Sequence, residues 1–229
     1  MKHTRTLALL GVTATTALAG AAPALAGTTV TVRIEGKNKT LLATRKVTTS
    51  SGWLTRFGAP KGACSAGSAA GALNTATHGA WSGKYGIGGY ADYFITRILG
   101  DVESGTRSFW DIFVNDVSAA SGACGITLHR GEQLLFAAVP ASGFTYPLGL
   151  QGPSHSLVGA TVSVKTLWFD ARGKAKPLAG ALVTGSGVSA KSSAQGIVHI
   201  HLSQAGTLSI KASKRGYVRS DSLRIVEQP

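Results

Sequence analysis

The segment Ser108–Val117, SFWDIFVNDV, constrains the fold more than any other stretch of the chain. Its side chains alternate between two rows, as in a β-strand: Trp110, Ile112 and Val114 form one, and Phe109, Asp111 and Phe113 form the other. The uniformly apolar first row predicts a core face, and the interrupted second row favours a face that is partly exposed or covered by a partner. Asn115 favours a turn after the strand, and Gly125–Phe136 continues with a strand, a Gly131-Glu132 turn and another strand.

The chain before this segment combines strand and helix patterns. Thr28–Glu35 alternates apolar and polar residues, and Lys39–Thr48 returns after a turn as the second strand of a hairpin. Ser65–His78 carries small apolar residues at helical spacing, with Ser65 or Ser68 as N-cap and Gly79 as terminator. Trp81–Tyr93 is rich in glycine and aromatic residues and predicts a surface loop. Further strands are expected at Phe94–Leu99, Phe109–Val114, Gly125–Leu128 and Gln133–Ala138. A hairpin, a helix and then several strands predict a small α+β domain.

The pattern changes after Gly143–Ser156, which contains two prolines and three glycines and is typical of a linker. Beyond it the chain shows short strand patterns separated by turn signals, without a convincing helix. These strands are expected at Val158–Trp168, Gly180–Val183, Ile197–Leu202, Thr207–Ala212 and Ser222–Val226. This favours an all-β sandwich.

The N-terminus is typical of a secretory signal. Lys2 and Arg5 precede the apolar Leu7–Ala19, and Ala24-Leu25-Ala26 fits an A-x-A cleavage site. We therefore expect a signal peptide over 1–26, a first domain over 27–142, a linker over 143–156 and a second domain over 157–229. The product would be secreted or peripheral to the cell wall, with no transmembrane segment after signal removal.

The chain is strongly basic, with 23 Lys and Arg against 10 Asp and Glu. For an exported protein this argues against nucleic acid and favours an anionic cell-wall polymer or membrane surface as partner. A solvated basic surface that keeps the protein soluble is the simpler explanation of the charge, and we favour it. Two short clusters stand out late in the chain: Arg172, Lys174 and Lys176, then Lys211, Lys214 and Arg215.

The chain contains two cysteines, Cys64 and Cys124. An even number in an exported chain predicts one structural disulfide. The flanking sequence GACSAG lacks the pattern of papain-like enzymes, and no CxxC pair occurs for redox or zinc chemistry.

The N-terminal half resembles the transcobalamin-like C-terminal domain family over roughly Thr28–Ala138. The resemblance rests on TVTVRIEG, CSAGSAAGALNTATHG with Trp81, YFITRILG, SFWDIFVNDV and GITLHRGEQLLF. Asp116 follows Asn115 where the family has glycine, so the turn is expected to be less tight. The resemblance implies a β-grasp-like ligand or interaction domain without catalytic residues. The resemblance does not imply a cofactor. Cobalamin is only an alternative, because the helical barrel that helps hold it in animal carriers has no counterpart in this sequence.

The C-terminal half resembles carboxypeptidase regulatory-like and bacterial Ig-like domains. The residues that carry this resemblance lie in Asp170–Gly173, Pro177–Val183, Ser193–Val198 and Ala205–Thr207. The resemblance implies an Ig-like or prealbumin-like sandwich that acts as a spacer, stability or adhesion module.

The aromatic residues provide the candidate ligand site. Trp81, Tyr85 and Tyr90, with Tyr93, could form a stacking surface for a flat or sugar-like ligand, although Trp81 and Tyr93 could equally anchor the loop to the core. Trp110 and Asn115 complete the candidate set.

Catalytic and metal patterns are weak. No G-x-S-x-G motif occurs. His199 and His201 share one face of an expected strand, but without a third ligand we favour two solvent-facing residues over a metal site.

These features predict a secreted, non-enzymatic protein in which a β-grasp-like module binds a ligand or partner and a β-sandwich presents it. The alternative is a structural or adhesive wall-associated protein held by its positive charge. A hydrolase with an unrecognised site is the third hypothesis, which a His beside a nucleophile and a carboxylate would revive.

Overall fold

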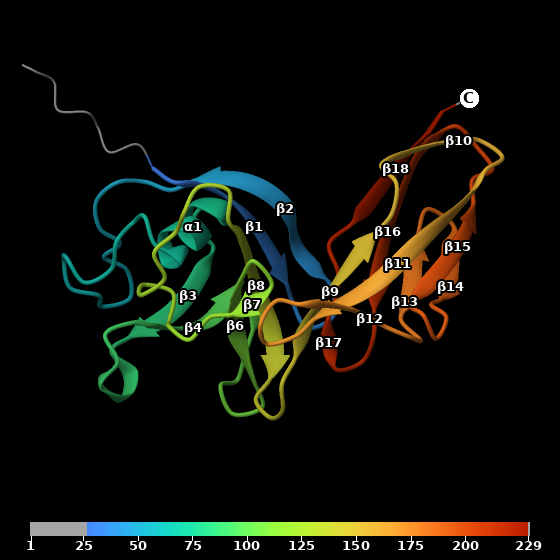
Figure 1. Cartoon of the computed structure of the whole chain (residues 1–229). Coiled ribbons are helices and arrows are strands. Elements are labelled where there is room, and N and C mark those ends of the chain that lie inside the picture. Colours follow the sequence, from blue (N-terminus) through green and yellow to red (C-terminus); the bar gives the residue numbers. More distant parts are fainter. Residues whose placement is uncertain (1–26, 229) are drawn as a thin grey trace, which may run out of the picture.

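The computed structural model describes residues 27–228 and consists mostly of β-strands. The expected signal peptide lies outside the described residues. Figure 1 shows two parts side by side: an N-terminal part, residues 27–140, and a C-terminal part, residues 146–228. No helix within the described range combines the length and the apolar character needed to cross a bilayer.

A five-stranded sheet forms the centre of the N-terminal part, in the order β2-β1-β8-β6-β7. Its strands are β1 (Thr29–Glu35), β2 (Thr40–Thr48), β6 (Ser108–Val114), β7 (Val117–Ser118) and β8 (Gln133–Pro140). β1 pairs parallel with β8, whereas its pairing with β2 and the β6–β8 pairing are antiparallel. The hairpin and the strands predicted at Phe109–Val114 and Gln133–Ala138 are confirmed.

The predicted helix exists but is shorter than expected: α1 spans Ala69–Ala76. The Ser68 hydroxyl caps it by accepting a hydrogen bond from the Gly71 N–H at 3.5 Å. Gly71 is required by packing rather than tolerated, because a Cβ there would lie 1.9 Å from the Ala66 carbonyl oxygen. The buried face is small, so α1 lies close against β1 and β2.

Two of the secondary-structure predictions in this part are wrong. Trp81–Tyr93 is not a continuous loop, because β3 (Trp81–Tyr85) forms a small sheet with β4 (Tyr93–Ile98) and β5 (Asp101–Val102), with the 3₁₀ turn η1 (Ile87–Gly89) between β3 and β4. Of the four glycines that suggested a loop, Gly86, Gly88 and Gly89 lie beyond β3, whereas Gly83 lies within β3 and pairs with Ile95. Gly125–Leu128 forms no strand and contributes only an isolated bridge between Thr127 and Ser68.

The predicted disulfide between Cys64 and Cys124 is confirmed, with Cα atoms 5.0 Å apart. It connects the loop that precedes α1 to the segment between β7 and β8. Both of these segments have little regular structure. In the chain-entropy model a crosslink over a separation of 60 residues stabilises the fold by about 4 kcal/mol.

The interpretation of 143–156 as a linker is wrong for its secondary structure. Tyr146–Gln151 forms β9, which pairs antiparallel with β11 (Thr161–Phe169) and parallel with β17 (Tyr217–Val218). Proline and glycine usually indicate a turn, but here both lie in a strand. Pro147 is tolerated because it pairs with the short strand β17, and Gly149 is needed because the Phe169 ring packs against it. The exact domain boundaries stay a prediction.

The C-terminal part contains two further sheets, consistent with a β-sandwich. One has the order β10-β18-β16-β13-β14, with bounds β10 (His155–Leu157), β13 (Leu182–Gly185), β14 (Val188–Lys191), β16 (Gly206–Ser213) and β18 (Leu223–Gln228). The other joins β9 to β11 (Thr161–Phe169), β12 (Ala175–Pro177), β15 (Ile197–His201) and β17 (Tyr217–Val218). The predicted strands correspond to β11, β13, β15, β16 and β18, with shifted bounds, whereas β9, β10, β12, β14 and β17 were not predicted.

A separate apolar cluster joins the two parts. Its buried members are Phe113, Leu135, Ala137 and Val139 from the N-terminal sheet and Val218 from β17, with Phe109 packed against them. Trp110 and Ile112 face the other way, into the main core of the N-terminal part. In the second row of the SFWDIFV strand, Phe113 is therefore buried while Phe109 and Asp111 are half-buried. The row is covered by the C-terminal part of the same chain, whereas the sequence pattern left open partial exposure or a partner.

Candidate functional site

A cavity of about 700 Å³ lies at the junction of the two parts. We call it the basic pocket. The N-terminal part contributes the β1–β2 turn, the loop between β5 and β6 and the end of β8, and the C-terminal part contributes the turn between β16 and β17. Its charged lining residues are Lys37, Glu103, Arg107, Lys214, Arg215 and Arg219. Five cations thus surround a cavity with one carboxylate.

The turn between β16 and β17 presents two of these cations. Gly216 adopts φ +85°, which side-chain-bearing residues rarely adopt, and the Tyr217 N–H closes the turn on the Lys214 carbonyl at 3.2 Å. Lys214 and Arg215 are therefore displayed on a tight turn, and both are exposed. Among residues 27–228, Lys37, Arg107, Lys214 and Arg215 form no ion pair within 4 Å. Lys214 does donate to the Ala179 carbonyl at 2.7 Å.

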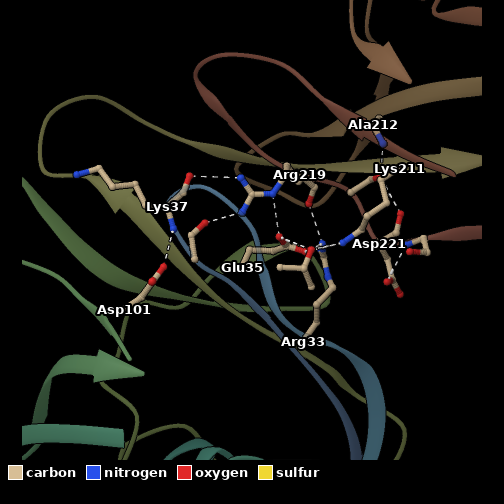
Figure 2. Close-up of polar contacts among 12 residues, drawn as sticks. Arg33, Glu35, Lys37, Asp101, Lys211, Ala212, Arg219 and Asp221 are labelled. Atoms are coloured by element: carbon tan, nitrogen blue, oxygen red, sulfur yellow. Dashed lines mark hydrogen bonds and ion pairs between the residues drawn. The ribbon is translucent and has the colours of Figure 1, made fainter. Parts of the chain in front are cut away.

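A buried carboxylate beside the pocket fixes the two parts to each other. Figure 2 shows Glu35 surrounded by Arg33, Arg219 and Lys211. Its oxygens lie 3.2 Å from Arg33 Nη1, 3.0 Å from Lys211 Nζ and 3.1 Å from Arg219 Nε. Glu35 is only 1 % exposed, and Thr40 also donates to it. We call these four charged residues the Glu35 cluster.

Backbone contacts reinforce the Glu35 cluster and position the edge of the pocket. Arg33 Nη1 donates to the Arg219 carbonyl at 2.7 Å, and Arg219 Nη1 donates to the Lys37 carbonyl at 3.3 Å. The Lys37 N–H in turn donates to Asp101 at 3.2 Å (Figure 2). Arg219 therefore belongs both to the cluster and to the pocket wall.

Glu103 is the acidic residue in the wall of the pocket. It is 5 % exposed, and among the described residues its Oε2 atom has no hydrogen-bond partner. A buried carboxylate oxygen without a partner is costly and uncommon. Its charge lowers the positive potential of the pocket, and it forms no ion pair within 4 Å in the described chain.

Two aspartates in turns lie near the other side of the junction. Asp116 shares a smaller cavity of about 270 Å³ with Arg33 and Asp221. Burial raises the pKa of Asp116, and the charge of Arg33 opposes this effect. At half-buried Asp170, the Lys176 ammonium at 2.9 Å and the Arg172 and Lys174 N–H groups lower the pKa to about 2.

The structure brings part of the predicted aromatic set together, since Trp81 and Tyr85 pack against Tyr93, which lines one cavity with Tyr90. Trp81 is 2 % exposed and donates its indole N–H to Asn74 at 3.1 Å, and its ring packs edge-on against Tyr93 at 5.2 Å. Tyr85 also packs against Tyr93, with ring centroids 5.3 Å apart. Tyr90 is 77 % exposed and lines a shallow cavity of about 360 Å³ with Ile87 and Phe94. Trp81 therefore anchors the core, and only Tyr90 of these three is freely presented.

Trp110 and Asn115 lie elsewhere. Trp110 is 7 % exposed, and within the described chain its indole N–H has no hydrogen-bond partner. Asn115 and Asp116 form the two-residue turn between β6 and β7, both at positive φ. The Asn115 side chain accepts from the Gln133 N–H at 3.0 Å, which ties the turn to β8. The five predicted residues are not brought together in one cavity, and a ligand role for any of them stays a prediction.

The two histidines on β15 are both exposed. His199 Nδ1 lies 3.1 Å from the Ser163 hydroxyl on the adjacent strand β11. Within residues 27–228, no group of three His, Cys, Asp or Glu residues is gathered in metal-binding geometry.

Sequence patterns identified only part of the basic pocket. Lys214 and Arg215 belong to one of the basic clusters that the sequence displays, and Lys37 lies in a predicted turn. Glu103, Arg107 and Arg219 are isolated charges in the sequence, and Glu35 lies at the end of a strand whose polar row has no evident cover. Arg33 and Glu35 share one face of their strand, which is a signal for an ion pair at that position, whereas Glu103, Arg107 and Arg219 carry no such signal.

Comparison with known proteins yields one family match. Residues 72–138 match the model of a domain of unknown function, DUF4430. The match runs from the middle of α1 to near the end of β8 and covers less than a third of the chain. No curated protein and no solved structure matches the chain.

Proposed function

We propose that this protein is a secreted, non-enzymatic binding protein whose ligand is an anion held in the basic pocket. The observation that carries the proposal is the convergence of five cations from both parts on one cavity, four of which have no ion pair within the described chain. Unpaired cations on the wall of a concave site create a positive potential that concentrates anions.

We also propose the finer fold assignments. A β-grasp-like module over 27–142, similar to the transcobalamin-like domains, is supported by the parallel pairing of β1 with β8, by α1 packed on β1 and β2, and by the family match at 72–138. An Ig-like sandwich over 157–229 is supported by the two sheets around one apolar core. Export is supported by the disulfide together with the signal-like N-terminus.

The sequence predicted that one domain binds the ligand and the other presents it. The basic pocket supports a different arrangement. Both parts contribute cations to the same cavity, and the Glu35 cluster fixes their relative position. In this proposal the C-terminal part therefore supplies half of the binding site.

The test is titration of the mature protein with tripolyphosphate by calorimetry at low salt. We expect saturable binding to one site, which weakens steeply as NaCl is raised from about 50 to about 500 mM because exposed charges are screened beyond a Debye length. Exchanging both turn cations, Lys214→Ser with Arg215→Ser, should weaken binding by about tenfold, since each exposed ion pair contributes up to about 1 kcal/mol.

The matched control is Lys191→Ser with Arg224→Ser. These two bases are exposed and lie on β14 and β18, outside the lining of the pocket, so this variant has the same net charge as the first. Unchanged affinity in the control supports a defined site. Equal weakening in both variants supports the alternative, a wall-associated protein held by diffuse positive charge. Absence of tripolyphosphate binding at low salt contradicts the proposal.

A further inference from the structure

A row of aromatic side chains leads away from the basic pocket. Tyr217 lines the pocket itself. Its ring centroid lies 6.2 Å from that of Trp168, which lies 5.2 Å from that of Tyr146, which in turn lies 6.5 Å from that of Phe144. We call these four residues the aromatic row. None of them belongs to the aromatic set that the sequence pattern singled out.

The aromatic row is partly presented to solvent. Phe144 is 87 % exposed, the largest exposed fraction among the exposed large apolar side chains, and its ring stacks on Tyr146 with an interplanar angle of 20°. Tyr146, Trp168 and Tyr217 are half-buried. Trp168 and Tyr217 also pack against the C-terminal core, which fixes the position of their rings. An exposed phenylalanine stacked on a fixed row indicates a surface kept for contact with another molecule.

The charges around the aromatic row are positive except for Asp170, which lies 2.9 Å from Lys176 Nζ. Lys176 Nζ lies 5.1 Å from the centroid of the Trp168 ring. At the other end of the row, Lys214 and Arg215 flank Tyr217 in the same turn. A ligand that runs along the row would therefore meet flat apolar faces first and cations at the pocket.

Resting on the proposed function, we propose that the ligand is an anionic glycan, with sugar rings on the aromatic row and acidic groups in the basic pocket. The C–H groups of a sugar ring carry partial positive charge and stack on the negative face of an aromatic ring. Carboxylate or phosphate groups on the same chain pair with the exposed cations. A polyanion without sugar rings would use only the pocket.

The inference is tested by comparing ligands of similar charge. The full mature protein is titrated with oligogalacturonate, a hyaluronan oligosaccharide and dextran sulfate as anionic glycans, with tripolyphosphate as an anion without sugar rings, and with neutral dextran. We expect at least one anionic glycan to bind about tenfold more tightly than tripolyphosphate, and neutral dextran to bind weakly.

Variants then separate the aromatic row from the pocket. Phe144→Ala removes an exposed side chain outside the core and should weaken glycan binding severalfold while tripolyphosphate binding stays unchanged. Tyr146→Ala is the second variant, in case one exposed ring contributes too little. The matched control is Tyr90→Ala, which removes another highly exposed aromatic ring, from the site that the sequence predicted.

The outcomes distinguish the two proposals. If every anionic glycan binds no more tightly than tripolyphosphate, or if Phe144→Ala and Tyr146→Ala leave glycan binding unchanged, the glycan inference is wrong and the anion site stands. If Tyr90→Ala alone weakens glycan binding, the ligand lies on the sequence-predicted surface instead. If neither tripolyphosphate nor any glycan binds at low salt, the anion site itself is wrong.

Discussion

Two groups of cations lie at the same junction, and the structure treats them differently. Arg33 and Lys211, with Arg219, converge on buried Glu35 and also donate to a hydroxyl or to backbone carbonyls. Lys37, Arg107, Lys214 and Arg215 face the basic pocket without an ion pair in the described chain. Arg219 connects the two groups.

The two groups of cations therefore have different roles: one stabilises the junction, and the other is available to bind a ligand. In the Glu35 cluster, each cation has an acceptor within the protein, so the cluster can hold the two parts together without a ligand. In the pocket, most of the cations depend on water or on a ligand for their acceptors. Binding energy is therefore available in the pocket, and structural energy lies in the cluster.

The largest effect is expected when the cluster loses its carboxylate. Glu35→Gln leaves three cations around a neutral side chain, and loss of one partner of a buried ion pair costs about 3–5 kcal/mol of unfolding free energy. Since Lys211 and Arg219 keep side-chain exposures of 25 % and 23 %, we expect a loss near the lower end, about 3 kcal/mol. Urea denaturation followed by tryptophan fluorescence measures it.

The control for this variant is Glu227→Gln on β18, which forms no ion pair in the described chain and should change stability by less than about 0.5 kcal/mol. A Glu35→Gln protein as stable as this control would show that the cluster does not hold the junction, and the contrast between the two groups of cations would fail.

Much of the fold could be predicted from local patterns. β1 and β6 alternate, β8 is a continuous apolar run, Ser68 caps α1, and the two cysteines form a disulfide. These features could be predicted because each depends on residues near one another in sequence or on a simple count. Prediction failed where a long-range partner decided the structure. Gly149 and Pro147 lie in a strand because β11 and β17 pair with it, which no local signal showed.

The candidate site was harder to predict for the same reason. The basic pocket brings together segments that lie more than 170 residues apart, such as Lys37 and Arg215. Its walls depend on how the C-terminal part packs on Phe113 and Val139, and a single sequence does not show that packing. The aromatic row likewise draws on Phe144, Trp168 and Tyr217, from three separate segments.

A smaller effect is expected from the carboxylate in the pocket. Glu103→Gln removes a negative charge from a site that we propose binds anions, and two unit charges at about 4 Å interact by about 1 kcal/mol in water, so tripolyphosphate affinity should rise by about fivefold. Calorimetric titration of the variant beside the wild type measures this. The control is Glu132→Gln, an acid in the turn before β8 that does not line the pocket. Weaker binding by Glu103→Gln would instead show that this carboxylate accepts a hydrogen bond from the ligand, so that the pocket is not purely cationic in its chemistry.

The smallest effect is expected from two half-buried aspartates, of which Asp170 pairs with Lys176 and Asp116 forms no ion pair in the described chain. Because burial raises the pKa of Asp116, the folded protein holds this proton more tightly than the unfolded chain, and its contribution to stability falls as pH rises above about 4. Asp116→Asn should therefore stabilise the protein at pH 7, within the ~0.5 kcal/mol typical of surface substitutions. This gain should shrink at about pH 3, where both states are protonated.

Asp170 behaves in the opposite sense, since its pKa is lowered to about 2, so its contribution is present at neutral pH and lost as pH falls through that value. Asp170→Asn should destabilise the protein at pH 7 and lose its effect in acid. Urea unfolding of both variants at pH 7 and about pH 3 measures the two opposite slopes. Since Asp116 has positive φ, a pH-independent part of its gain would reflect the preference of asparagine for that backbone conformation rather than charge. Equal effects of Asp116→Asn at both pH values would leave only that backbone contribution and would show that the charge of Asp116 does not affect stability.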